Sequence, residues 1–153
     1  MNKLSVNFFS AVRFGTVLGE EDRPLLGRKT WKIMQRILIL SLDPIRTELV
    51  RATLSGLDVE LRVATSKEAF RRLTEQLVYD LVIVLDAAPF FSGRALFRRV
   101  RPRPLRRPKI YVISWQQAEQ TVVGLLESGV DQYMTFPLNP VRLRAKVIGD
   151  LMR

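Results

Sequence analysis

The stretch that decides the fold is Tyr79-Asp80-Leu81-Val82-Ile83-Val84-Leu85-Asp86, which runs into Ala87-Ala88-Pro89-Phe90-Phe91-Ser92-Gly93. A continuous apolar run of this length predicts a strand that is buried on both faces of a parallel sheet. The run ends in the carboxylate of Asp86, and a Pro, Ser and Gly turn follows. We therefore expect an acid at the carboxyl edge of the sheet, where open α/β sheets place their functional sites.

Strand and helix signals alternate on both sides of this stretch. The expected strands are short apolar runs, and two of the expected helices begin with an N-cap residue followed by proline. Alternating apolar and charged residues over 59–63 are typical of an edge strand with one exposed face. We expect strands near residues 37–40, 59–63, 80–86, 110–113 and 133–136, and helices near 43–55, 66–77, 92–100, 116–128 and 139–151.

Apolar residues at helical spacing indicate which face of each helix is buried. In the helix near 43–55, these residues are Ile45, Leu49 and Ala52. The corresponding residues of the other helices are Ala69, Phe70, Leu73, Leu77, Val122, Leu125, Leu126, Leu143, Val147 and Leu151.

Five strand–helix units in succession predict an α/β protein. Right-handed crossovers place helices on both faces of a five-stranded parallel sheet. The topology that fits best is the flavodoxin-like order 2-1-3-4-5.

Composition limits the chemistry available to this chain. The 153 residues are 47% apolar and 26% charged, which is ordinary for a globular domain, and the chain has neither cysteine nor histidine. Disulfides, thiolate metal sites and histidine catalysis are therefore excluded. No apolar run reaches the roughly 18 residues that a membrane-spanning helix needs, so we expect a soluble protein without a membrane partner. We also expect it to be cytoplasmic and not to be an enzyme.

Residues 1–33 are expected to lie outside the domain. Their apolar residues follow neither the helical nor the strand period, and the acidic triplet at 20–22 argues against a secretory signal. Met34 directly precedes the first clear strand signal. Residues 34–153 therefore form the predicted domain, and residues 1–33 are either an N-terminal extension or the product of an upstream start codon.

Residues 35–153 resemble the receiver domain of bacterial two-component response regulators. The resemblance rests on the Asp43-Pro44 helix start, the stretch from Asp80 to Gly93, Ser114 at the end of the fourth strand, Gly129 before Tyr133, and Pro137 after the fifth strand. It implies a CheY-like signalling module. In this family an aspartate is phosphorylated with the help of a magnesium ion, an acidic pair and a lysine.

This sequence departs from the family at the positions that carry the chemistry. The acidic-pair positions are Ser41 and Leu42, and the lysine position, directly before the proline, is Phe136. Without gaps, the acceptor position is Leu85, and Asp86 lies one residue later. Because a one-residue shift turns a strand side chain to the opposite face, Asp86 would need an extra residue in the strand to take the acceptor's place.

Two positions of the family's conformational relay remain. Ser114 provides the hydroxyl that would follow a phosphoryl group, and Tyr133 is the aromatic residue that would rotate with it. Without the acidic pair and lysine, both also fit purely structural roles. Trp115, beside Ser114, is large enough to fill the space that a phosphoryl group would need.

Three functions fit these residues. The leading hypothesis is a pseudo-receiver without cofactor or metal, which binds a protein partner through the fourth helix, fifth strand and fifth helix, over residues 116–151. The second is binding to a polyanion through the basic run from 94 to 109. The third is a divergent phosphoreceiver that uses Asp86 and magnesium, and the oligomeric state is left open.

That basic run concentrates the charge of the chain. The formal net charge is +10, and the run holds eight cations without an acid. A nucleic acid or an acidic protein would suit it, because arginine favours bidentate contact with phosphate. Its cations are Arg94, Arg98, Arg99, Arg101, Arg103, Arg106, Arg107 and Lys109.

Overall fold

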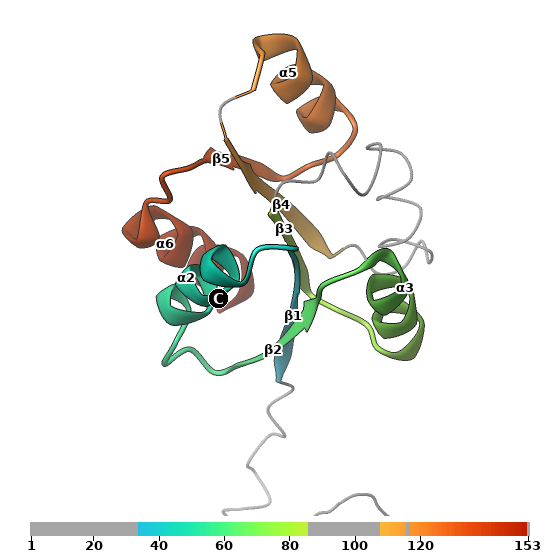
Figure 1. Cartoon of the computed structure of the whole chain (residues 1–153). Coiled ribbons are helices and arrows are strands. Elements are labelled where there is room, and N and C mark those ends of the chain that lie inside the picture. Colours follow the sequence, from blue (N-terminus) through green and yellow to red (C-terminus); the bar gives the residue numbers. More distant parts are fainter. Residues whose placement is uncertain (1–33, 86–107, 116, 153) are drawn as a thin grey trace, which may run out of the picture. The chain divides into compact units, whose positions relative to one another are not determined.

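The computed structural model describes residues 34–85, 108–115 and 117–152 (Figure 1). Three of the expectations above fall outside these residues: the extension over 1–33, the helix near 92–100, and the position of Asp86. Of the basic run, only Pro108 and Lys109 are described.

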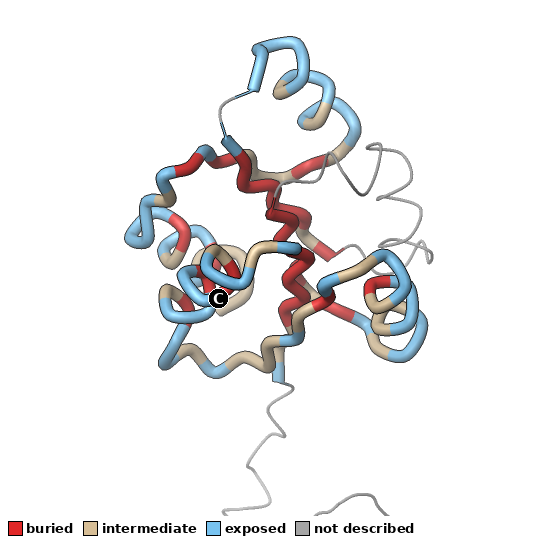
Figure 2. Tube along the Cα trace, in the orientation of Figure 1, coloured by how far each residue is buried: buried red, intermediate tan, exposed pale blue. Residues whose placement is uncertain are grey.

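Five parallel strands form one sheet in the order β2-β1-β3-β4-β5, as predicted. The central strand β3 pairs with β1 on one side and β4 on the other, so every one of its residues is buried (Figure 2). β2 and β5 are the edge strands of the described sheet. The strands are β1 (Gln35–Leu40), β2 (Val59–Ala64), β3 (Leu81–Leu85), β4 (Lys109–Ser114) and β5 (Gln132–Thr135).

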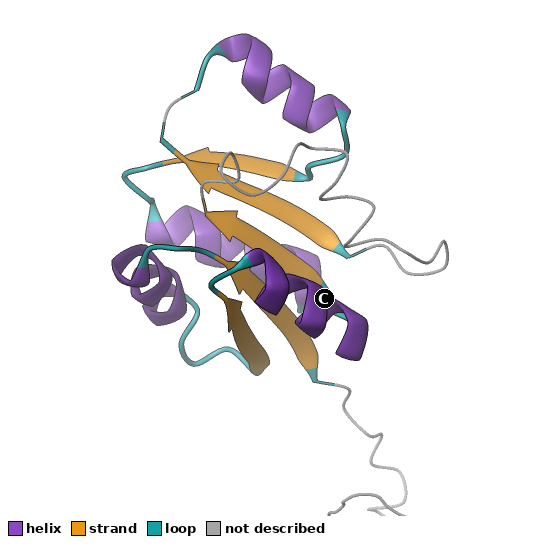
Figure 3. Ribbon diagram, turned by 45° about the vertical axis from the view of Figure 1, so that its right-hand side comes forward, coloured by secondary structure: helices purple, strands orange, loops and turns teal. Residues whose placement is uncertain are grey.

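The described helices cover both faces of the sheet (Figure 3). α2 and α6 pack against one face, and α3 and α5 lie on the other, where Phe70 of α3 and Leu125 of α5 meet the second apolar core. The helices are α2 (Pro44–Thr53), α3 (Lys67–Gln76), α5 (Glu119–Glu127) and α6 (Pro140–Leu151). This arrangement matches the predicted α/β class with helices on both faces.

The expected N-caps are confirmed at the start of α2 and α6. The Asp43 carboxylate accepts from the backbone N–H groups of Ile45 and Arg46, and the Asn139 side chain accepts from that of Arg142. Each helix has proline in its first turn. Both begin at the carboxyl edge of the sheet, because each follows the end of a parallel strand.

The predicted buried face of α2 is wrong. Ile45 is 80% exposed, Leu49 is 41% exposed and Ala52 is exposed as well, whereas Thr47, Val50 and Leu54 are buried. Both sets of residues follow the helical period, so the choice depended on apolarity alone. Thr47 can be buried because its hydroxyl donates to the Asp43 carbonyl oxygen at 2.8 Å, which satisfies the polar group within the helix.

α5 is also more exposed than its sequence suggests. Val122 and Leu125 are partly buried as expected, but Leu126 is 45% exposed and Val123 is 43% exposed. Gly129 ends the helix as predicted, with the positive φ of 113° that glycine adopts without strain. An apolar side of α5 therefore lies at the surface of the described structure.

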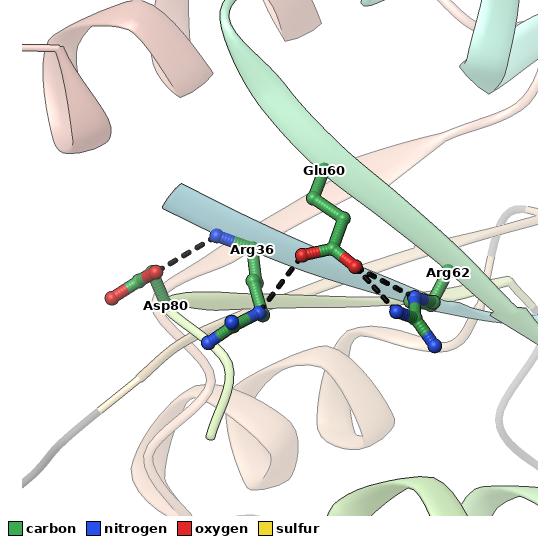
Figure 4. Close-up of polar contacts among 4 residues, drawn as sticks. All are labelled: Arg36, Glu60, Arg62 and Asp80. Atoms are coloured by element: carbon green, nitrogen blue, oxygen red, sulfur yellow. Dashed lines mark hydrogen bonds and ion pairs between the residues drawn. The ribbon is translucent and has the colours of Figure 1, made fainter. Parts of the chain in front are cut away.

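Charged residues join three strands at the amino edge of the sheet (Figure 4). The Arg36 backbone N–H donates to the Asp80 carboxylate at 2.8 Å, and the Arg36 side chain donates to Glu60 at 2.9 Å. Arg62 donates to the other Glu60 oxygen. Burial alone would raise the pKa of Glu60, but the hydrogen bonds from Arg62 and Arg36 outweigh it and hold that pKa below its ordinary value. The cluster fixes the edge opposite the candidate site.

Candidate functional site

Strand ends and helix starts meet at the carboxyl edge of the sheet. Ser41 follows β1, and Phe136 follows β5. Ser114 is the last residue of β4, and Trp115 comes directly after it. The backbone closes this edge, because Ser41 N–H donates to the Ala64 carbonyl oxygen at 3.0 Å and Phe136 N–H donates to that of Ser114 at 2.9 Å. These bonds join Ser41 to the end of β2 and Phe136 to the end of β4.

The two acidic-pair positions offer little to a metal ion. Ser41 is fully buried, and its hydroxyl donates to the Asp43 carbonyl oxygen and accepts from the Asp43 N–H. Leu42 is 59% exposed and has no polar side-chain atom. The neighbouring Asp43 carboxylate caps α2 and also pairs with Arg46. The oxygens of this segment are therefore engaged within its own turn.

Apolar side chains stand at the positions predicted for the acceptor and for the lysine. Leu85, the last residue of β3, is 2% exposed and belongs to the same apolar core as Phe136, which is 8% exposed. Leu85 pairs with Ile113 of β4, in continuous register with the rest of β3. The strand is thus regular up to Leu85, and Asp86 lies outside the described residues.

Sequence reasoning missed Arg46, which lies in the middle of this edge. Its Cζ atom is 5.1 Å from the ring centroid of Trp115 and 4.9 Å from that of Phe136. The two rings are 5.4 Å apart and tilted by 50°. A signal was present in the sequence: Arg46 occupies the first turn of a helix that begins at this edge, where two strands end in aromatic residues.

The relay positions Ser114 and Tyr133 are in direct contact. Their hydroxyl oxygens are 3.1 Å apart, and both also approach the Trp115 carbonyl oxygen, Ser114 at 3.1 Å and Tyr133 at 3.3 Å. Ser114 is buried, and Tyr133 is partly buried against the core below α5. About half of Trp115 is exposed to solvent, so this residue lies at the surface of the carboxyl edge.

Comparison with known proteins gives the family. The sequence matches the family described as "Response regulator receiver domain" over residues 37–148. The chain belongs to this receiver domain family. Receiver domains are signalling modules of two-component systems, and the strand order described above is theirs.

One curated relative and two solved structures illustrate the match. The transcriptional regulatory protein TrcR of Mycobacterium tuberculosis is 33% identical over 121 residues, which cover 77% of this chain and 46% of TrcR. The chain thus spans about half the length of this curated relative. A CheY-like receiver domain protein from Methanospirillum hungatei superposes with a TM-score of 0.66 at 22% identity, covering 78% of this chain and 95% of that one.

The second structure contains a metal. The receiver domain of a Pseudomonas aeruginosa sensor histidine kinase, with magnesium coordinated in its active-site cleft, gives a TM-score of 0.65 at 19% identity and covers 79% of this chain and all of that one. Receiver domains bind magnesium through oxygen ligands. The described residues at the two acidic-pair positions do not fit that ion, because Leu42 has no side-chain oxygen and the buried Ser41 hydroxyl is engaged with the Asp43 backbone.

The described residues also bear on three other possibilities: a cluster of metal ligands, a membrane-spanning helix and a larger basic surface. No group of three or more acidic side chains able to hold a metal occurs among them, and none of their helices is long and apolar enough to cross a membrane. Arg144 of α6, which could have extended the basic run, instead donates to the carbonyl oxygens of Thr53 and Ser55 at 2.9 and 2.8 Å. It closes the carboxyl end of α2.

Proposed function

We propose that this receiver domain is a pseudo-receiver: a cytoplasmic protein-interaction module that signals without phosphorylation. The observation that carries the proposal is the state of the two acidic-pair positions: the Ser41 hydroxyl is buried and engaged within its own turn, and Leu42 has no side-chain oxygen. These positions therefore offer a magnesium ion no carboxylate ligand.

The neighbouring positions support the same conclusion. Phosphoryl transfer to an aspartate requires charge neutralisation by a metal and a lysine. Here Ser41 uses its hydroxyl in its own turn, Leu42 is apolar, and Leu85 at the gap-free acceptor position packs in the core. Leu42 and Leu85 have no polar side-chain atom for a phosphoryl group, and the Ser41 hydroxyl is buried and already hydrogen-bonded.

The partner surface in this proposal consists of α5, β5 and α6. α5 exposes Val123 and Leu126, two apolar side chains that a partner could cover. Tyr133 of β5 lies between this helix and the candidate site. A change at the site would therefore reach the partner surface through β5.

Beryllofluoride tests the proposal. In a Trp31→Phe background, Trp115 is the only tryptophan and reports on the candidate site. Millimolar magnesium with beryllofluoride should leave its fluorescence and the amide NMR spectrum unchanged, whereas a receiver with the full acidic pair and lysine responds as a positive control. A saturable response that disappears in Asp86→Asn would overturn the pseudo-receiver and support the phosphoreceiver that uses Asp86 and magnesium.

A second candidate function is polyanion binding by the basic run. Eight cations without an acid over residues 94–109 favour it. If the run binds nucleic acid, affinity should fall with salt with a log–log slope of about −0.9 per phosphate contacted, and about four to six contacts suit its length. Absence of binding to duplex and single-stranded nucleic acid at about 50 mM salt would reject it and leave an acidic protein as the partner of the run.

A further inference from the structure

Four side chains form one connected unit at the carboxyl edge, which we call the Arg46 clamp: Asp43, Arg46, Trp115 and Phe136. The guanidinium lies within about 6 Å of both ring centroids, the range in which a cation is attracted to an aromatic face. The measured separations are 5.1 Å for Trp115 and 4.9 Å for Phe136. The clamp joins α2 to the ends of β4 and β5.

Asp43 holds the guanidinium in place. One carboxylate oxygen lies 3.1 Å from Arg46 Nε, while the other caps the first turn of α2. The side chains of Arg46 and Asp43 are only 25% and 37% exposed. Because both groups are partly removed from water, their attraction and the cation–π contacts are stronger than at a fully exposed site.

Trp115 connects the clamp to the hydroxyl pair of Ser114 and Tyr133. Its side chain contacts Arg46, and its backbone carbonyl oxygen lies 3.3 Å from the Tyr133 hydroxyl and 3.1 Å from that of Ser114. Gln117 Nε2 also donates to this carbonyl at 3.1 Å. The contact of Arg46 with the Trp115 ring therefore restricts the position of the Trp115 carbonyl oxygen, which accepts from the two hydroxyls.

Phe136 provides the second connection. Its N–H donates to the Ser114 carbonyl oxygen at 2.9 Å, and its ring lies beneath the guanidinium. Both aromatic members of the clamp are thus attached to the backbone of Ser114.

We propose that Arg46 is a positioning residue that sets the hydrogen bonding of Tyr133 through the Trp115 carbonyl. Because Arg46 contacts the residues that follow β4 and β5, these contacts hold the arrangement of β5 without a phosphoryl group. This inference rests on the proposed function and deepens it, because it identifies the contact that holds the α5, β5 and α6 surface in one state.

A double-mutant cycle tests the coupling. Tyr133→Phe removes the hydroxyl, and Arg46→Met removes the guanidinium while keeping an unbranched stem. The unfolding equilibrium is measured by urea titration for each single variant and for the pair. In the wild-type chain, loss of the Tyr133 hydroxyl should shift the unfolding equilibrium by about fivefold, the effect of one net hydrogen bond. In the Arg46→Met chain the same loss should shift it by less than about twofold.

Arg51→Met is the matched control. Arg51 lies on the same helix and pairs with Glu48 at 3.0 Å, but its side chain is 43% exposed against 25% for Arg46, and no contact with an aromatic ring is seen for it in the described structure. Its effect should add to that of Tyr133→Phe without coupling. Arg46→Lys keeps the charge but loses the planar guanidinium, so its coupling to the Tyr133 hydroxyl should be intermediate. This variant replaces Arg46→Met in the cycle if the methionine variant does not fold.

NMR of ring-labelled tyrosine provides the second readout. Arg46→Met should shift the Tyr133 ring resonances and leave those of Tyr111 unchanged, since Tyr111 is anchored to α6. Additive effects in the cycle together with unshifted Tyr133 resonances would overturn the inference. A beryllofluoride-induced shift in the wild-type chain would instead overturn the proposed function, so the two failures are distinguishable.

Discussion

Replacing Tyr111 by phenylalanine removes one oxygen atom from the middle of the sheet and keeps the buried ring. Tyr111 lies on β4 and is fully buried. Its hydroxyl donates to the Asp150 carboxylate and lies 3.1 Å from the Lys146 carbonyl oxygen. Both acceptors belong to α6, so this hydroxyl anchors a helix of the proposed partner surface to the sheet.

The expected cost follows from the kind of hydrogen bond. Because the ring remains, no cavity forms, and the loss is that of a hydrogen bond to a charged group, about 1.5–3 kcal/mol. A loss of about 2 kcal/mol should lower the melting temperature of a domain of this size by about 5–10 °C. Urea unfolding at pH 7, followed by circular dichroism, measures the free energy of unfolding directly.

Alkaline pH gives an independent check on the same hydroxyl. Burial first, and then the hydrogen bond to Asp150, raise the pKa of Tyr111 far above its ordinary value of 10.0. The folded chain keeps the proton above pH 10 while the unfolded chain releases it, so this stabilisation is present below pH 10 and is lost as pH rises. The stability difference between wild type and Tyr111→Phe should shrink by about 1.4 kcal/mol per pH unit above 10.

Tyr79→Phe is the control that separates hydrogen bonding from burial. The Tyr79 side chain is 3% exposed, and within the described structure its hydroxyl has no hydrogen-bond partner. Removing that hydroxyl should be neutral or stabilising at pH 7, since it is buried without a partner. If Tyr111→Phe costs no more than Tyr79→Phe at pH 7, the hydroxyl does not anchor α6 and the reasoning is refuted.

Three further predictions concern charged residues and the beginning of the chain. Glu60→Gln should lower the free energy of unfolding by about 0.5–1 kcal/mol at pH 7. Because the pKa of Glu60 is held below its ordinary value of 4.5, this difference should vanish as pH falls through the lowered pKa, and a difference that persists in acid would contradict the assignment. Arg144→Met should cost about 1 kcal/mol by urea titration, since it removes two charge-assisted hydrogen bonds to the end of α2, whereas the exposed Arg142→Met should stay within about 0.5 kcal/mol. A chain that starts at Met34 should melt within about 5 °C of the full chain if residues 1–33 lie outside the domain, and a larger loss would show that they contribute to its core.

Much of the fold could be predicted because its signals are local. The buried run of β3, the alternation at 59–63, and the caps at Asp43 and Asn139 each act through neighbouring residues. With the rule of right-handed crossovers, the elements they locate led to the strand order that the structure has. The face of α2 could not be predicted this way. Thr47 is polar in the sequence, yet its hydroxyl is satisfied within the helix and its side chain is buried, while Ile45 remains in solvent.

The candidate site likewise has one part that the sequence shows and another that only the tertiary structure shows. The sequence by itself determined which chemistry is missing, because Leu42 and Phe136 lack the oxygen and the amine that the family uses, whatever surrounds them. Only the tertiary structure decided what stands in their place, because Arg46, Trp115 and Phe136 come from three segments that meet when β1, β4 and β5 pair with their neighbours. A cation–π contact depends on the distance between side chains, and sequence spacing carries no information about that distance across a sheet.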